Sequence, residues 1–276
     1  MSKVLYQGAP ASYSEIAAKK FLGKETECKG VNTFAELYEM LAAQNADYAA
    51  IPIENSLIGP IWENDDLLPL YDIEVVGEYY LRIEHCLLAA HEGDLKGLKK
   101  VLSHPKALDQ CRKFFKEHPW IEPVVHFDTA GAAREIAAAK KPTVGAIASS
   151  ETAAIYGLAV LQKNLEDDSQ NFTRFIFIRQ KRAANESGMA DKCSLIFSLP
   201  HRPGALYHVL AEFADKQLNL SRIASRPIKG RPFEYLFYLD CEFAPERQKE
   251  IEMVLEKMKQ HSEFFKPLGF YKRHIR

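Results

Sequence analysis

Short apolar runs alternate with helical patterns through the first 180 residues, and this alternation constrains the fold more than any other feature of the sequence. Most of the runs lead directly into a segment with helical spacing. Strands that alternate with helices in this way are typical of α/β proteins with mostly parallel sheets. We therefore predict α/β layering, with strands at residues 4–6, 48–53, 101–102, 124–127 and 144–147.

Several polar residues indicate where the helices begin. Ser12 with Glu15, and Thr33 with Glu36, have the spacing of a capping box, in which two side chains satisfy free backbone N–H groups at a helix start. Asp128 precedes an alanine-rich helix and is expected to be its N-cap. Most of the helix starts therefore lie just beyond a predicted strand.

Small polar residues gather where these strands end. In open α/β sheets, ligands bind beyond the carboxyl ends of the strands, where loops meet helix N-termini. Each residue taken singly can equally be a helix cap, but the recurrence after nearly every strand predicts a shared polar cleft. Free N–H groups at the helix N-termini would favour an anionic ligand there. The residues concerned are Ser12, Tyr13, Ser14, Glu54, Asn55, Ser56, Ser103, His104, Asp128, Thr129, Ser149 and Ser150.

The pattern changes after a polar segment at residues 181–191, which we predict to be a linker. We place a second domain at residues 192–276. Its pattern predicts a strand at 194–199, a helix at 203–213, strands at 218–224 and 233–240, a helix in which Ile251, Val254, Leu255 and Met258 share a face, and a strand at 264–271. This β-α-β-β-α-β order indicates a ferredoxin-like α+β unit. Because such a unit leaves one sheet edge and one helix face uncovered, we expect it to pair with a second copy.

Composition excludes several classes of protein. The chain of 276 residues is too long for one comfortable core, which favours two domains. Lys plus Arg number 36 against 37 Asp plus Glu, so no nucleic-acid partner is expected. Five scattered cysteines indicate neither a disulfide framework nor a zinc site. With no signal peptide and no apolar run of about 18 residues, we expect a cytoplasmic protein without a membrane partner.

Short motifs also occur in a fixed order along the chain. They are YQGAPASYSE at 6–15, PIENS at 52–56, HCLL at 85–88, SHPKALDQC at 103–111, DTA at 128–130, AS at 148–149, YGL at 156–158 and NFTRF at 171–175. Each motif alone is weak, but in register they resemble the prephenate dehydratase family and cover nearly the whole chain. The resemblance implies a catalytic domain at 1–180 with two lobes, similar to a periplasmic binding protein. Lobe one is expected at 1–78 plus 170–180, and lobe two at 79–169.

The C-terminal unit resembles the ACT domain, the amino-acid-sensing module of the same family. The two effector motifs of that module match residues 204–207 and 225–227. The resemblance implies feedback regulation by L-phenylalanine, bound between paired ACT domains of a homodimer or homotetramer. The effector would contact Gly204, Ala205, Leu206 and Tyr207 of one copy, and Asn219, Leu220, Ser225, Arg226 and Pro227 of its neighbour.

The chain departs from the family pattern at two positions. Ala224 stands where the family usually has glutamate, immediately before the second effector motif, which leaves the strength and sign of the L-phenylalanine response open. Ala11 stands where glycine is common, in the loop after the first strand. That second change is tolerated if the backbone at Ala11 keeps a negative φ.

The resemblance implies a lyase that converts prephenate to phenylpyruvate, carbon dioxide and water in L-phenylalanine biosynthesis. Aromatisation drives this reaction, so neither a metal nor another cofactor is expected. The catalytic tripeptide would be Thr173-Arg174-Phe175. Thr173 would hydrogen-bond the departing hydroxide, a contact worth about 3–4 kcal/mol. Arg174 would anchor the pyruvyl carboxylate in bidentate fashion, and Phe175 would pack to hold both. Substrate contacts are expected from Ser12, Ser14, Asn55, Ser56, Ser103, His104 and Thr129.

The tripeptide also has the pattern of a half-buried strand, with Thr173, Phe175 and Phe177 on one face. In a regular strand Arg174 would point the other way, and Thr173 and Arg174 could not share a pocket. Either the tripeptide lies in a bend before the strand, or Arg174 reaches a different wall of the cleft. We favour the bend, because this position suits a crossover between two lobes.

Other readings of the chain stay open at this point. The same chemistry on arogenate would differ only in an amino group that replaces a keto group. A non-catalytic amino-acid sensor would have the same two lobes and the same ACT domain, but would not need the tripeptide. A proton relay to Thr173 from His104 or Glu54 is a further hypothesis. Few residues precede Tyr6, so we expect a monofunctional enzyme without a fused chorismate mutase.

Overall fold

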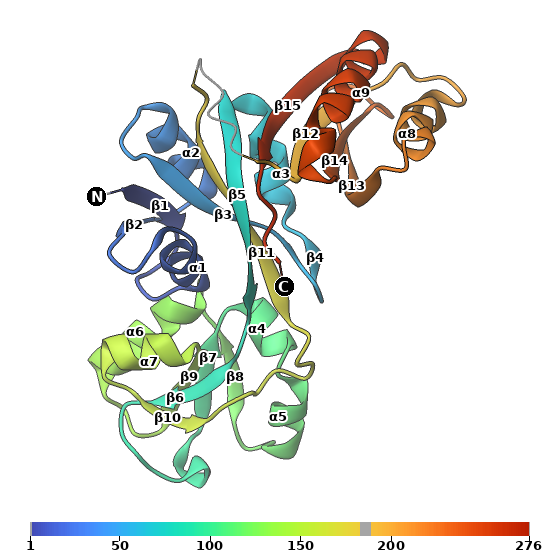
Figure 1. The fold of residues 1–276 in the computed structure, drawn as a ribbon. Helices are drawn as coiled ribbons and strands as arrows, with labels where there is room; N and C mark the ends of the chain where they lie inside the picture. Colours follow the sequence, from blue (N-terminus) through green and yellow to red (C-terminus); the bar gives the residue numbers. More distant parts are fainter. Residues whose placement is uncertain (1, 183–188, 276) are drawn as a thin grey trace.

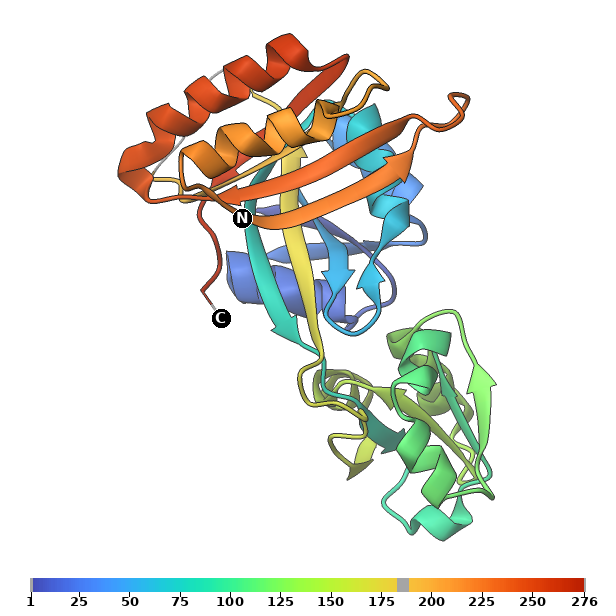
Figure 2. The same ribbon diagram turned by 90° about the vertical axis from the view of Figure 1, so that its right-hand side faces the viewer.

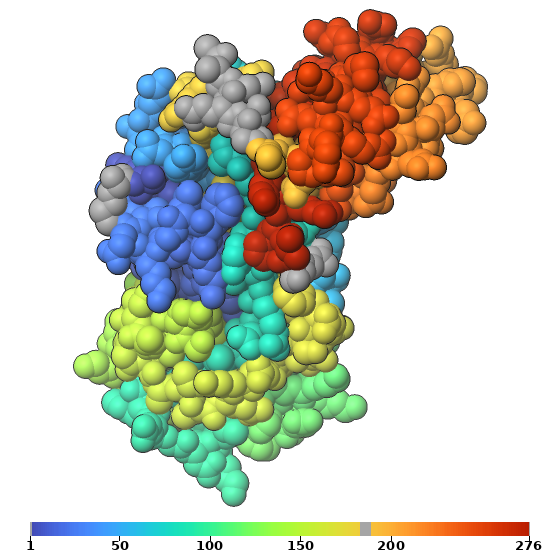
Figure 3. Space-filling model, in the orientation of Figure 1, coloured from blue at the N-terminus to red at the C-terminus, as the bar shows by residue number. Residues whose placement is uncertain are grey.

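The computed structural model describes residues 2–182 and 189–275, and it has three parts (Figure 1). Two α/β lobes lie one above the other, and a C-terminal unit packs beside the first lobe. Figure 2 shows the three parts from the side, and the space-filling view in Figure 3 shows the C-terminal unit closely packed on lobe one. Within the described residues, no helix is long and apolar enough to cross a membrane.

Lobe one is built on a sheet in the order β2-β1-β3-β11-β5, with the short strand β4 beside β3. The pairs formed by β1 with β2 and β3 are parallel, whereas β11 is antiparallel to both of its neighbours. The strands are β1 (Lys3–Gln7), β2 (Glu27–Val31), β3 (Tyr48–Asn55), β4 (Gly59–Pro60), β5 (Ile73–Arg82) and β11 (Phe172–Gln180). The helices are α1 (Tyr13–Leu22), α2 (Phe34–Ala42), α3 (Trp62–Leu67) and the 3-10 turn η1 (Leu68–Leu70).

Lobe two repeats this plan with a sheet in the order β10-β6-β9-β7-β8. Strands β7, β8 and β9 are parallel, and β6 and β10 add antiparallel pairs. The strands are β6 (Cys86–Ala89), β7 (Lys100–Ser103), β8 (Glu122–Val125), β9 (Val144–Ala148) and β10 (Ala159–Gln162). The helices are η2 (Leu95–Gly97), α4 (Pro105–Asp109), α5 (Arg112–Glu117), α6 (Thr129–Ala139) and α7 (Ser150–Tyr156). These two lobes confirm the predicted α/β layering. The expectation of mostly parallel sheets is wrong, because four strand pairs of the described lobes are parallel and five are antiparallel.

The chain passes between the lobes twice, after β5 and before β11. Strand β5 pairs with β11 along its whole length, from Ile73 opposite Gln180 to Arg82 opposite Phe172. Lobe one therefore extends to Arg82, four residues beyond the boundary expected from the sequence. The bend predicted for the tripeptide at residues 173–175 is wrong, because pairing with β3 on one side and β5 on the other holds this segment extended.

The C-terminal unit has the predicted β-α-β-β-α-β order, with antiparallel strands in the order β13-β14-β12-β15. Helices α8 and α9 cover one face of this sheet (Figure 2). The elements are β12 (Lys192–Ser198), α8 (Ala205–Asp215), β13 (Asn219–Pro227), β14 (Tyr235–Glu242), η3 (Pro245–Arg247), α9 (Gln248–His261) and β15 (Phe264–Tyr271). Of the linker expected at 181–191, residues 183–188 lie outside the described residues.

The other face of the C-terminal sheet packs on lobe one. Ile196 and Tyr238 from this sheet join Leu41 and Ile176 of lobe one in a single apolar core. The approach is so close that a Cβ added to Gly269 on β15 would lie 2.7 Å from the carbonyl oxygen of Val75 on β5. Because apolar burial scales with area removed from water, a shared core stabilises this docked arrangement as well as each part.

The loop after β1 carries a strained residue. Ala11 has a φ of 68°, in the left-handed region that favours glycine. The negative φ that would have made the alanine harmless is therefore absent. Two polar contacts hold this conformation: the Ala11 N–H donates to the Glu15 carboxylate at 2.7 Å, and the Thr152 hydroxyl of lobe two donates to the Ala11 carbonyl at 3.0 Å. The strain therefore lies at a contact between the two lobes.

Candidate active site

A cavity of about 420 Å³ lies between the two lobes. Its walls come from the loop between β1 and α1, the end of β3, strand β11, and the N-terminal ends of α4 and α6. This is the edge where the sequence predicts a polar cleft. Of the predicted catalytic and substrate-contact residues, the cavity is lined by Ser12, Ser14, Asn55, His104, Thr129, Thr173 and Phe175.

Ser56 and Ser103 were also expected to contact substrate, but each bonds to backbone outside the cavity lining. The Ser103 hydroxyl is buried and donates to the carbonyl of Ile147 at 2.7 Å, which ties β7 to β9. The Ser56 hydroxyl donates to the carbonyl of Gln170 at 2.6 Å and accepts from the N–H of Phe172 at 2.9 Å. Both serines therefore hold neighbouring backbone segments of the site together. The prediction that they contact the substrate is corrected.

The position of Arg174 contradicts the prediction that it anchors the pyruvyl carboxylate. Arg174 is 3% exposed and points away from the cavity, toward the C-terminal unit. Its Nε donates to Glu78 at 2.8 Å, and one terminal nitrogen pairs with Asp240. Burial lowers the pKa of Arg174, but Asp240, Tyr271 and Glu78 together outweigh it and raise the pKa well above its usual value. Successive side chains of a strand face opposite ways, so Arg174 cannot anchor a carboxylate beside Thr173.

Thr173 has a hydroxyl whose orientation follows from its neighbour. The Asn55 side-chain oxygen accepts the backbone N–H groups of Leu57 and Ile58, each at 3.0 Å, so the Asn55 amide nitrogen must face the other way. That nitrogen donates to Thr173 Oγ1 at 3.0 Å and to Asn171 Oδ1 at 2.8 Å. An oxygen that accepts from Asn55 keeps its own O–H for a further acceptor. In this arrangement Thr173 is a hydrogen-bond donor toward the cavity.

The polar chain continues to a histidine that the sequence patterns did not single out. Gln110 Nε2 donates to Asn171 Oδ1 at 3.4 Å, and the Gln110 carbonyl oxygen lies 2.9 Å from His85 Nε2. His85 Nδ1 lies 3.1 Å from the hydroxyl of Tyr13. Because a carbonyl oxygen only accepts, Nε2 carries a proton. Burial lowers the pKa of His85, so the ring is neutral at neutral pH.

His85, Lys106 and Gln110 line the cavity but were not predicted as site residues, and Tyr13 was expected at the polar cleft but not as a substrate contact. All four stand inside motifs that carried the family resemblance. The signal that could have identified them is therefore their place in those motifs, rather than spacing or periodicity. Their side chains meet only because the lobes face each other, since Tyr13 belongs to lobe one and Gln110 to lobe two.

The electrostatics of the cavity favour an anion. Among the described lining residues, Lys106 is the one cationic side chain and Asp128 the one acidic side chain. Asp128 is occupied, because its carboxylate caps α6 at the N–H of Gly131. At the start of α1, no side chain caps the helix, and the buried Ser12 hydroxyl has no partner among the described residues. A helix N-terminus with free donors stabilises negative charge.

The predicted effector residues lie in the C-terminal unit, and they do not form one cluster within a chain. Gly204, with a φ of 81°, starts α8, whereas Asn219 follows the other end of that helix. An α-helix of 11 residues is about 16 Å long. Arg226 is turned toward lobe one, where it pairs with Asp66 at 2.7 Å and lies over the ring of Trp62. The effector contact expected of Arg226 stays a prediction, because its side chain is still 27% exposed beside this ion pair.

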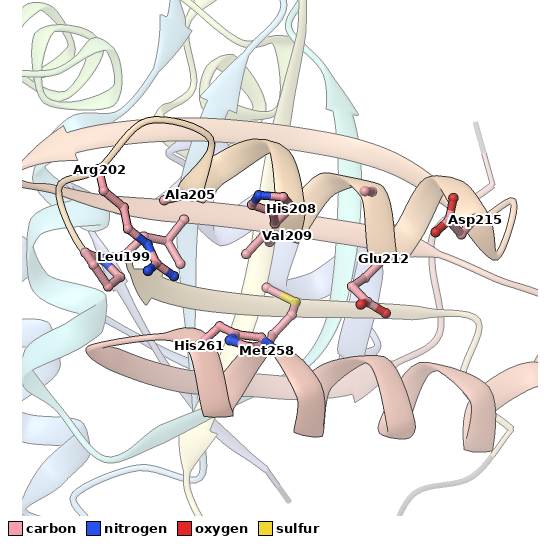
Figure 4. A pocket seen from close by; sticks show the side chains of 11 residues that line it. Leu199, Arg202, Ala205, His208, Val209, Glu212, Asp215, Met258 and His261 are labelled. Atoms are coloured by element: carbon pink, nitrogen blue, oxygen red, sulfur yellow. The ribbon is translucent and has the colours of Figure 1, made fainter.

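A second cavity, of about 380 Å³, lies between α8 and α9 (Figure 4). Arg202 and His208 line it from the α8 side, and Met258 and His261 line it from α9. Ala205, one of the predicted effector residues, also belongs to its wall. This hollow is separate from the interlobe cavity, and it lies on the face of the sheet that points away from lobe one.

Together, the fold and the interlobe cavity define a two-lobed α/β protein whose cavity suits a small anion. A family model described as prephenate dehydratase matches residues 4–183. Prephenate dehydratase of Methanocaldococcus jannaschii is 38% identical over 273 residues, which is 97% of each chain. Arogenate dehydratase/prephenate dehydratase 2 of Arabidopsis thaliana is 38% identical over 280 residues, which is 98% of this chain and 72% of that relative. The chain belongs to the prephenate dehydratase family.

Solved structures agree over the whole length. A prephenate dehydratase from Arthrobacter aurescens, in complex with L-Phe, has a TM-score of 0.88 at 28% identity, over 98% of this chain and 90% of that one. A protein described as a novel type of quorum quenching acylase has a TM-score of 0.89 at 31% identity, over 99% and 98%. The fold is therefore shared by proteins described with different activities. The activity of this chain has to be inferred from the residues of its site.

Proposed function

We propose that the chain is a prephenate dehydratase that forms phenylpyruvate, carbon dioxide and water. The observation that carries the proposal is the Thr173 hydroxyl, which lines the interlobe cavity and accepts from Asn55. It is thereby available as a donor where negative charge develops. Family membership over residues 4–183 identifies the reaction.

In this reaction the ring hydroxyl of prephenate leaves with its bonding electrons. The bond between the ring and its carboxylate breaks, and that electron pair completes the aromatic ring as carbon dioxide departs. The leaving hydroxide takes up a proton and becomes water. A hydrogen bond from Thr173 stabilises the charge that develops on the leaving oxygen. Removal of one such donor in other enzymes raises the barrier by about 3–4 kcal/mol.

Because Arg174 does not face the cavity, other groups must bind the carboxylates of prephenate. Lys106 is the cationic side chain of the described cavity lining, and the uncapped start of α1 supplies free backbone donors. We assign Lys106 to the pyruvyl carboxylate, which is retained in the product. The carboxylate that departs is better held by weaker, neutral donors such as Ser12 and Ser14, because tight binding would oppose its loss.

The neutral chain from Tyr13 to Thr173 holds the leaving-group donor in place. His85, Gln110, Asn171 and Asn55 connect through amide and ring hydrogen bonds. Each group in such a network limits the rotation of the next. His104 lines the same cavity, but its Nδ1 already accepts the N–H of Lys106 at 3.2 Å as a helix cap. Glu54 lies near Arg174, at 3.4 Å, so a relay from Glu54 to Thr173 is not part of this proposal.

The direct experiment measures phenylpyruvate release from prephenate by the purified chain, with arogenate in a parallel assay. Arogenate replaces the keto group with an ammonium group, which Lys106 would repel if the two lie close. We therefore expect faster turnover of prephenate. If neither substrate is consumed by folded protein, the proposed activity is wrong.

Regulation by L-phenylalanine through an ACT domain is a second part of the proposal. The Arthrobacter aurescens relative is described in complex with L-Phe. In this chain, Gly204 and Asn219 lie at opposite ends of α8, so one ligand can meet both only across two copies. Antiparallel pairing of α8 with the α8 of a second copy would bring those ends together.

The surface around β13 suits such pairing. β13 is an edge strand of its sheet. Nearby, Ile223 is 48% exposed and Tyr207 is 70% exposed. Apolar side chains beside an unpaired edge are typical of a strand or helix face that a second copy covers. We propose a homodimer formed through this surface, or a tetramer built from two such dimers. Sedimentation with and without L-phenylalanine tests this, and a monomer under both conditions contradicts it.

The cavity residues do not support an acylase activity, although one similar structure is described as a quorum quenching acylase. A serine nucleophile needs a base within hydrogen-bond reach. Among the described cavity residues, the hydroxyl of Ser12 has no partner, and His85 is engaged with Gln110 and Tyr13. A cytoplasmic location and a monofunctional chain stay predictions from the sequence.

A further inference from the structure

Two adjacent residues of strand β11 have side chains in different surroundings. Thr173 lines the interlobe cavity on one face. Arg174, on the opposite face, is buried against the C-terminal unit. The two Cα atoms are separated by one trans peptide, about 3.8 Å. A group that holds Arg174 therefore also restrains the backbone that presents the Thr173 hydroxyl.

The partners of Arg174 come from both sides of the interface. Glu78 on β5 accepts from Nε at 2.8 Å, and Tyr271 on β15 accepts from Nη2 at 3.1 Å. Asp240 on β14 pairs with Nη1. Ser194 on β12 holds these two C-terminal partners, because its hydroxyl lies 2.5 Å from Asp240 Oδ1 and 2.7 Å from the Tyr271 hydroxyl. Two strands of the C-terminal sheet thus bond the guanidinium directly, and a third, β12, holds both of these partners.

A buried lysine completes the cluster that Arg174 forms with Glu78, Asp240, Ser194 and Tyr271. Lys192 on β12 lies 3.1 Å from Glu78 and is fully buried. Two cations, Arg174 and Lys192, therefore meet two buried acids, Glu78 and Asp240. Burial raises the pKa of Asp240, but the charges of Arg174, Arg222 and Lys192 outweigh it and lower the pKa. Arg174 and Lys192 also reach the partly exposed carboxylates Glu54 and Glu242, at 3.4 and 3.3 Å. Removal of one buried acid therefore weakens the pairing of a buried cation.

The pairing of β11 is irregular at the same place. Against β3, Arg174 lies opposite Glu54, but Phe175 lies opposite Pro52, so one residue of β3 is skipped. Such bulges re-aim side chains and are common beside active sites. The irregularity means that the direction of Thr173 depends on more than the regular ladder of the sheet. The buried cluster behind it supplies the additional restraint.

We infer that Arg174 is a positioning residue through which the C-terminal sheet sets the direction of the Thr173 hydroxyl. A shift of β14 or β15 would move Asp240 and Tyr271, and with them Arg174 and the peptide that joins it to Thr173. This rests on the proposed function, because it assumes that Thr173 acts on the leaving group. It explains why an arginine follows the threonine without reaching the substrate.

The test changes the cluster from the C-terminal side, so that lobe one keeps its sequence. Tyr271→Phe removes a hydroxyl and preserves the ring, and Asp240→Asn removes one charge. Tyr235→Phe on β14 and Asp215→Asn on α8 are the matched controls, because both residues are outside the cluster and Tyr235 is 40% exposed. Each variant is compared with the wild type for kcat and KM on prephenate, for L-phenylalanine response, and for thermal unfolding.

We expect Tyr271→Phe to lower kcat about threefold to tenfold and Asp240→Asn to lower it more, with KM within about twofold. Both controls should match the wild type. A purely structural role would lower the unfolding temperature and leave kcat per folded molecule unchanged. That result in Tyr271→Phe overturns the inference, even if Asp240→Asn does not fold. Wild-type turnover of prephenate is measured first, so failure of the proposed function is seen separately.

Discussion

The amide nitrogen of Asn55 donates to Thr173 Oγ1 at 3.0 Å, across the ladder that joins β3 to β11. The two residues lie directly opposite each other in register. A side chain 118 positions away thus determines which lone pair of the threonine is occupied and leaves its proton for the substrate. The chemistry proposed for this protein depends on that contact.

Replacement of Thr173 with valine keeps the branched shape and removes the hydroxyl. We expect kcat to fall by about 10²–10³ with little change in KM, because the lost interaction acts on developing charge. Thr173→Ser keeps the donor and should retain activity within about tenfold. Steady-state assays of phenylpyruvate release measure both. Near-normal turnover in Thr173→Val removes Thr173 from the mechanism.

Replacement of Lys106 with glutamine removes the positive charge of the cavity lining. Hydrogen bonds to charged groups contribute about 1.5–3 kcal/mol, so KM for prephenate should rise about tenfold to a hundredfold. Lys99→Gln, on the exposed surface of lobe two, serves as the control. An unchanged KM in Lys106→Gln would show that the pyruvyl carboxylate is held elsewhere.

His85 makes the folding stability depend on pH. Burial lowers its pKa in the folded state, whereas the unfolded chain has the usual value of about 6.5. The unfolded state therefore binds the proton first as pH falls, so stability is full above about 6.5 and declines below it, by up to about 1.4 kcal/mol per pH unit. Urea unfolding at pH 7.5 and 5.5 measures this loss. His85→Asn should reduce it, and His261→Gln, at an exposed position, should not.

Replacement of Ala11 with glycine should stabilise the protein. A left-handed φ costs an alanine roughly 1–2 kcal/mol, and the greater freedom of glycine in the unfolded chain offsets part of the gain. We expect a net increase of about 0.5–1 kcal/mol in the free energy of unfolding. Ala42→Gly, at an exposed position in α2, should instead destabilise by a similar amount. Equal losses in both variants would contradict the strain at Ala11.

Replacement of Gly269 with alanine should weaken the docking of the C-terminal sheet. The new Cβ would lie 2.7 Å from the Val75 carbonyl oxygen, so β15 and β5 must separate. We expect a loss of about 1–3 kcal/mol in unfolding free energy. Gly230→Ala is the control, because its backbone φ is also positive but no heavy atom of the described residues lies within 4 Å of the added Cβ. Equal losses would assign the effect to φ alone.

Much of the architecture could be predicted from the sequence, because it depends on local patterns. Period-two and period-3.6 apolar spacing identified most elements, and capping residues such as Thr33 and Asp128 do bond the N–H groups that were expected. The motif order placed Asn55, His104, Thr129 and Thr173 at one cavity. Local spacing carried no information on His85 and Gln110, and their link to Tyr13 forms only because the two lobes face each other.

By itself, then, the sequence determined most of the element types, the two-part organisation and the family. Only the tertiary structure decided the role of Arg174. Its direction depends on whether residues 173–175 lie in a bend or in a strand, and partners from β3 and β5 settle that choice. Its ionic partner Asp240 is 66 positions away and reaches it only because the C-terminal sheet packs on lobe one. Local sequence cannot specify which charges a buried guanidinium will meet, because burial and pairing arise from contacts between distant segments.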